Sequence, residues 1–153
     1  LSKEKMKDIL LKDYGFSDAK AQSLSLFYEG RIGKAIRENF NIFDEKNRII
    51  DAFIDNSSED NFEIIKSGEK EKLYDYLLYL LTFYRDIWFV KMGLVRELVN
   101  SDIKEKIINS KNEYTFLELE NKINFISSFV SYLDQNVNHK LLLSILRINL
   151  CKK

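Results

Sequence analysis

The sequence EKEKLYDYLLYLLTFYRDIWFVKMG, from Glu69 to Gly93, decides the fold of this chain. Its apolar side chains fall at helical spacing on two sides of one helix. One side carries Leu73, Leu77, Leu80, Leu81, Tyr84 and Trp88, and the other carries Tyr76, Tyr79, Phe83, Ile87 and Val90. A helix that is apolar on nearly every face must be surrounded by other elements. We therefore expect this helix at the centre of a helical bundle.

Two adjacent charges, Arg85 and Asp86, interrupt the apolar surface of the central helix. Burying a charge is costly unless it is paired and hydrogen-bonded. We expect each of the two to meet a partner on a neighbouring helix or at a subunit interface. The pair then fixes the rotation of the helix and has no catalytic role.

The rest of the chain also indicates helices, because it contains no proline and only five glycines, which leaves few helix breakers. Before the central helix we expect five helices. The first three run over about 3–12, from a Ser17 cap to Gly30, and over 31–38. The fourth begins at an Asp44 cap and turns Ile49, Ile50, Phe53 and Ile54 inward, and the fifth begins at Ser57 or Ser58 and turns Phe62, Ile64 and Ile65 inward. After it we expect helices over about 102–108 with an Asp102–Glu105 capping box, from a Thr115–Glu118 capping box with Leu119, Ile123, Ile126, Val130 and Leu133 inward, and from an Asn138 cap with Leu141, Leu142, Ile145, Leu146 and Ile148 inward. The fold class is all-α.

The charge balance argues against a large nucleic-acid or membrane surface. The 153 residues include 24 lysines and arginines and 24 aspartates and glutamates, so the net charge is zero. The longest apolar run, from Tyr76 to Tyr84, is far shorter than the roughly 20 residues that a membrane helix needs. We expect any contact with DNA to be indirect and none with a membrane.

The cysteine usage and the first residue bear on where the protein works. A lone Cys151 cannot form an internal disulfide, which fits a reducing compartment. No charged-then-apolar leader precedes the first helix, so we expect a cytoplasmic protein. Because the chain begins at Leu1 and not at Met, we interpret it as part of a longer protein, so that any catalytic region would lie outside this sequence.

Catalytic and cofactor-binding patterns are absent from the sequence. His139 is the only histidine and follows a helix cap, which explains it without a function. There is no phosphate-binding glycine loop and no calcium loop. The aromatic side chains of the central helix are better explained by packing than by base stacking, because little positive charge lies near them. We expect no metal, no cofactor and no enzymatic activity.

Three stretches together resemble the clamp-loader subunits of bacterial DNA polymerase III, and among them the delta-prime subunit. AQSLSLFYEGRIGKAI, residues 21–36, is similar to the small helical lid that follows the ATPase core, with its signature at Gly30, Ala35 and Ile36. YRDIWFVKMG, residues 84–93, resembles the aromatic-Arg-Asp segment of the collar domain, with Tyr84, Arg85, Asp86 and Trp88. NVNHKLLLSIL, residues 136–146, resembles the ending of the family, with Asn136 and Asn138. His139 departs from it, since the family commonly has proline there.

Gly33 separates the members of this group. In the ATP-hydrolysing relatives a nucleotide-sensing arginine stands three residues after the glycine that corresponds to Gly30, and this chain has Gly33 there. A subunit that does not hydrolyse ATP tolerates the loss of that guanidinium. Arg31 and Lys34 point elsewhere around the helix, so we do not expect either to replace it, although a contact with nucleotide or DNA stays open for both.

The resemblance implies a lid over residues 1–39, built of three short helices, and a collar over residues 40–153. It implies a scaffold that holds one subunit in the pentameric clamp loader, which loads the sliding clamp onto primed DNA. Its partners are the delta and gamma/tau subunits, and the isolated chain is a monomer or a weak oligomer. The alternatives are the collar of the ATP-hydrolysing gamma/tau subunit and an unrelated helical domain that binds nucleic acid or another protein.

Overall fold

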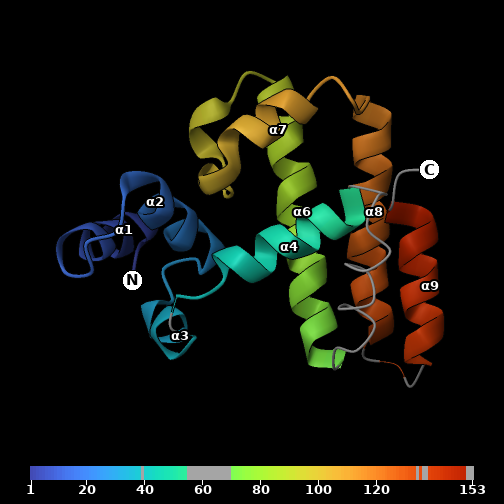
Figure 1. Cartoon of the computed structure of the whole chain (residues 1–153), viewed down its shortest axis with the longest axis horizontal. Coiled ribbons are helices and arrows are strands. Elements are labelled where there is room, and N and C mark those ends of the chain that lie inside the picture. Colours follow the sequence, from blue (N-terminus) through green and yellow to red (C-terminus); the bar gives the residue numbers. More distant parts are fainter. Residues whose placement is uncertain (39, 55–69, 134, 136–137, 151–153) are drawn as a thin grey trace. The chain divides into compact units, whose positions relative to one another are not determined.

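The structure is a computed structural model, and it describes residues 1–38, 40–54, 70–133, 135 and 138–150. Every regular element within these ranges is a helix, as Figure 1 shows. The predicted all-α class is therefore confirmed. Three of the predictions, the helix after Ser57 or Ser58, Asn136 and Cys151, lie outside the described residues.

The chain divides into two compact units. Unit 1 contains Leu1–Phe43 and Asp86–Asn112, and unit 2 contains Asp44–Arg85 and Glu113–Lys153. The long helix α6, Lys70–Lys91, begins in unit 2 and ends in unit 1. Its Arg85–Asp86 pair therefore stands at the point where the chain passes from one unit to the other.

Unit 1 begins with three short helices, α1 (Lys3–Lys12), α2 (Asp18–Phe27) and α3 (Ile32–Arg37). Serine caps open the first two: Ser17, the predicted cap of α2, accepts a hydrogen bond from the Lys20 amide, and Ser2 accepts one from the Lys5 amide at the start of α1. Met6, Leu10, Ala21, Leu24, Tyr28 and Ala35 form the core between them. The side-chain hydroxyl of the buried Tyr28 donates to Glu38 at 2.6 Å, which closes the end of α3 onto α2.

Gly30 ends the second helix for a steric reason. Its φ of 80° lies in the left-handed region, where residues with a Cβ are strained. A Cβ on Gly30 would also fall on the backbone carbonyl of Leu1, which passes directly against it. The glycine that the sequence predicts as a helix stop is thus required by conformation and by space.

The remainder of unit 1 differs from the prediction. Two 3₁₀ turns, η1 (Val95–Glu97) and η2 (Ser101–Ile103), precede α7 (Lys104–Ser110). The predicted Asp102–Glu105 capping box is wrong, because Asp102 lies inside η2 and no side chain caps α7. Asp102 instead accepts a hydrogen bond from the Ser23 hydroxyl of α2 at 3.5 Å. A contact across the fold has replaced the local one.

Unit 2 contains α4 (Phe43–Ile54), most of α6, α8 (Phe116–Leu133) and α9 (His139–Leu150). The Thr115–Glu118 capping box is confirmed by two reciprocal hydrogen bonds, from the Thr115 amide at 2.7 Å and from the Glu118 amide at 3.1 Å. Asn138 accepts from the Lys140 amide at the start of α9. Asp44 is not the cap of α4, since that helix already begins at Phe43, and it lies in the first turn.

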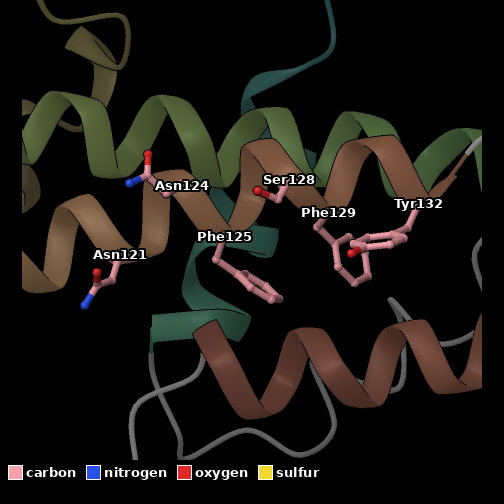
Figure 2. A pocket seen from close by; sticks show the side chains of 6 residues that line it. All are labelled: Asn121, Asn124, Phe125, Ser128, Phe129 and Tyr132. Carbon is pink, nitrogen blue, oxygen red and sulfur yellow. The ribbon is translucent and has the colours of Figure 1, made fainter.

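The central helix is enclosed largely as its pattern predicts. Leu73, Leu77, Leu80, Tyr84, Tyr76, Tyr79, Phe83, Ile87 and Val90 are buried, while Leu81 and Trp88 are half-buried. Within unit 2, α6, α8 and α9 run side by side in both views (Figures 1 and 2). Glu45 of α4 ties that helix to α6, because it accepts hydrogen bonds from Lys72 and from the Tyr79 hydroxyl, both at 3.1 Å.

The last helix turns a different face inward from the predicted one. Leu142 and Leu146 are buried as predicted, together with Leu143 and Leu150. Leu141 and Ile148 were predicted to be inward and are 54% and 73% exposed. Apolar residues occupy both sides of this helix, so helical periodicity alone did not identify the packed side.

Candidate interaction surface

Asp86 is a buried carboxylate that accepts three hydrogen bonds. The Val99 amide donates to Oδ1 at 3.1 Å, and the Asn100 amide and side chain donate to Oδ2 at 2.7 and 2.8 Å. Asn100 is itself fully buried. These bonds attach the last turns of α6 to the segment between η1 and η2. The carboxylate that the sequence singled out thus has a structural environment in which its charge is held by N–H donors.

Tyr84, which directly precedes Arg85 and Asp86 in α6, is fully buried in unit 2. Its hydroxyl donates to the Leu150 carbonyl of α9 at 3.3 Å, and its ring meets the Tyr114 ring edge-on at 5.8 Å. The Lys122 ammonium also donates to the Leu150 carbonyl, at 3.2 Å, and stands 5.5 Å from the Tyr84 ring centre. An aromatic hydroxyl and an ammonium thereby satisfy the last carbonyl groups of α9.

Tyr114 is the buried side chain whose ring packs against the Tyr84 ring. Burial raises the pKa of its hydroxyl, and the nearby carboxylates of Glu113 and Glu118 raise it further. The side chain therefore stays protonated in the folded protein at pH values where an unfolded tyrosine ionises.

We expect the free energy of unfolding to fall as the pH rises above about 10, the pKa of an unfolded tyrosine. Above that pH the unfolded chain releases the Tyr114 proton and the folded chain retains it, so alkali favours the unfolded state. Tyr114→Phe should flatten the decline, measured by urea unfolding from about pH 9 to about pH 11. Tyr132→Phe, which changes an exposed tyrosine on α8, is the matched control. An equally steep decline in both variants would contradict the assignment.

Arg85 and Trp88 are half-buried. The indole Nε1 of Trp88 donates to the sulfur of Met92 at 2.9 Å, one turn further along α6. Met92 and Leu94 are exposed on either side of Gly93, whose φ of 81° ends the helix as predicted. The end of α6 therefore presents an apolar surface of unit 1 that has the composition of protein interfaces.

A hollow of about 360 Å³ lies along one side of α8, and Figure 2 shows the six side chains that line it. The phenyl and phenol rings extend from α8 toward the side on which α9 lies (Figure 2). The lining residues are Asn121, Asn124, Phe125, Ser128, Phe129 and Tyr132. Three of these side chains are aromatic, three are asparagine or serine and none is charged, which favours an apolar or amide-bearing protein partner over a phosphate backbone.

The sequence did not predict this hollow. Ile123 and Val130 were expected to be inward on α8, and both are half-buried, whereas Phe129 is buried. A second apolar row at Phe125, Phe129 and Tyr132 was the available signal, since these residues repeat at helical spacing beside the core row.

The lid-motif residues lie in unit 1, apart from the hollow on α8. Ala35 is buried in α3, and Ile36 is 44% exposed. Gly33 is exposed in α3, and nothing lies within 4 Å of a Cβ placed on it. The predicted site residues that the structure describes are thus distributed over both units.

No group of three or more histidine, cysteine, aspartate or glutamate side chains among the described residues is arranged to hold a metal ion. None of the helices within the described part of the chain has the length and apolarity to cross a membrane.

The fold and its surfaces define an all-α domain with exposed apolar surfaces of the interface type. A family model described as the C-terminal domain of the DNA polymerase III delta subunit matches residues 41–150, more than half of the chain, and the chain belongs to this family. Comparisons with curated proteins and with solved structures gave no match. The predicted clamp-loader C-terminal region is confirmed, and the chain has a role in the clamp loader of DNA polymerase III.

Proposed function

We propose that this chain is the lid and collar of a clamp-loader subunit that does not hydrolyse ATP, of the delta-prime type. Residues 1–39 are the lid, and residues 40–153 are the collar that holds the subunit in the pentameric loader. The chain is a cytoplasmic scaffold and not an enzyme, and it contacts the sliding clamp and DNA only through its partners, the delta and gamma/tau subunits.

Gly33 is the observation that carries this proposal. A glycine at this position is not needed for packing, because its surroundings leave room for a side chain and its backbone is an ordinary helix. Packing therefore gives no reason for glycine at this position, and we attribute the missing side chain to function. A subunit without a nucleotide-sensing guanidinium has no group at this position to stabilise phosphate charge.

The two neighbouring cations have other contacts, which also supports the proposal. The Arg31 side chain donates to the Tyr28 carbonyl at 3.2 Å and lies 3.8 Å from the Glu29 carboxylate. The Lys34 ammonium lies 3.8 Å from the Glu38 carboxylate. Both side chains are thus engaged within the lid.

The decisive experiment reconstitutes the loader from its cognate subunits with one kind omitted at a time. We expect the chain to enter the collar, measured by native mass spectrometry, when delta-prime is omitted and not when delta or gamma/tau is omitted. Calorimetry should detect no ATP binding to the chain. Incorporation in place of delta or of gamma/tau, or tight ATP binding, would overturn the assignment, and a salt-dependent shift of DNA in a gel would favour a nucleic-acid-binding domain instead.

Gly33→Arg is the matched variant for this experiment. Gly33 is exposed and a Cβ placed on it has no atom within 4 Å, so we expect the arginine side chain to extend into solvent and the variant to melt no lower than the wild type. It should also enter the collar equally well, because subunit contact belongs to residues 40–153 in this proposal. Loss of incorporation by Gly33→Arg would place the subunit contact in the lid and contradict the proposed division.

A further inference from the structure

Phe40 has a backbone conformation that is unusual for a bulky residue. Its φ is 53°, in the left-handed region where a side chain with a Cβ is strained. Such a conformation persists only where the surrounding structure holds it. Among the described residues, Glu29 is the other non-glycine residue with a positive φ, 51°, and it provides a comparison within the same unit.

Two aromatic rings hold Phe40 in place. Tyr14 and Phe16 meet its ring edge-on, with centroid distances of 5.0 and 5.2 Å and interplanar angles of 64° and 67°. Both rings come from the turn between α1 and α2, on either side of Gly15. The Phe40 amide donates to the Ala35 carbonyl of α3 at 3.0 Å, and the Asn41 amide donates to the Glu38 carbonyl at 3.1 Å.

We propose that Phe40 is a conformational latch, a strained residue that the Tyr14 and Phe16 rings hold against the α1–α2 turn and that opens as a local unit. The ring contacts favour the latched state, and the left-handed backbone favours release. The strain opposes the ring contacts and the two backbone hydrogen bonds, so it weakens the preference for the latched state, which remains the major one. On release the Phe40 backbone relaxes to a negative φ, and the chain leaves α3 in a different direction.

Phe40 lies between α3 and the part of the chain that the family model matches. The family match begins at the next residue, Asn41, and α4 begins at Phe43. The latch therefore controls how the chain passes from α3 into the family domain, whichever clamp-loader subunit this is. Tyr14 is 45% exposed, and the other two rings are half-buried, so the contact can open without exposing the core of unit 1.

Amide hydrogen exchange on the whole chain tests the latch. Tyr14→Ala removes one ring contact, and we expect exchange of the Phe40 and Asn41 amides to become about tenfold faster relative to α1 and α2 amides. Tyr132→Ala removes a ring of similar exposure on α8 and should leave both rates unchanged. Rates in Tyr14→Ala within twofold of the wild type would overturn the proposal.

A second variant separates a latch from ordinary packing. Phe40→Gly removes the ring and relieves the strain, so Tyr14→Ala in that background should change exchange of the Asn41 amide by less than twofold. Glu29→Gly relieves a similar backbone strain elsewhere and should leave the tenfold effect of Tyr14→Ala intact. If Tyr14→Ala accelerates Asn41 exchange equally with and without the Phe40 ring, Phe40 is not the latch.

Discussion

Asp86→Ala is expected to lower the free energy of unfolding by about 3–5 kcal/mol. The substitution leaves three N–H groups of the buried 99–100 segment without their carboxylate acceptor, and each unsatisfied buried donor costs about 1–3 kcal/mol. For a chain of this size the melting temperature should fall by about 10 °C, measured by circular dichroism.

The matched controls separate the hydrogen bonds from the charge. Asp8→Ala removes an exposed carboxylate of α1 and should change the melting temperature by no more than about 2 °C. Asp86→Asn keeps the shape and one acceptor oxygen, but its amide NH₂ group replaces the other oxygen and faces the N–H donors of Val99 and Asn100. Its cost should therefore lie between those of Asp8→Ala and Asp86→Ala. If Asp86→Ala melts with Asp8→Ala, the hydrogen bonds to Val99 and Asn100 do not stabilise the fold.

Asp86 also shows how far the sequence can predict a buried polar group. A carboxylate within an apolar helix indicates that a partner exists. Two of the three N–H groups of Val99 and Asn100 that donate to it are backbone amides, and every residue except proline has one, so no residue type marks where they come from. The Asp102–Glu105 prediction failed in a related way, because a capping pattern describes only local hydrogen bonds and Ser23 of α2 supplies a distant one.

The helices were predictable where a single face dominates. Ser17 and the Thr115–Glu118 box mark predicted helix starts that the structure confirms, since a cap needs only residues that are close in sequence. α9 was not predictable to the same degree, because Leu141 and Ile148 give its outer side the same apolar character as its packed side. Which side packs depends on α6 and α8, and periodicity within α9 contains no such information.

Tyr84→Ala is expected to destabilise unit 2 by about 3–5 kcal/mol, because it removes a fully buried ring and leaves a cavity between α6, Tyr114 and Lys122. Tyr84→Phe keeps the ring and loses only the hydrogen bond to the Leu150 carbonyl, at a cost of about 1 kcal/mol. Urea unfolding of the two variants measures both values. Equal effects in the two would mean that the ring contributes nothing beyond its hydroxyl.

Lys122 makes the Tyr84 prediction sharper, because both side chains donate to the same carbonyl oxygen. When one donor is removed the other still satisfies the Leu150 carbonyl, and when both are removed that carbonyl loses both of these hydrogen bonds. The Lys122→Met and Tyr84→Phe combination should therefore cost more than the sum of the single variants, by about 0.5–1 kcal/mol. Strictly additive effects would show that the two donors act independently. The contact between α9 and α6 would then depend on the aromatic packing of Tyr84 and not on the shared Leu150 carbonyl.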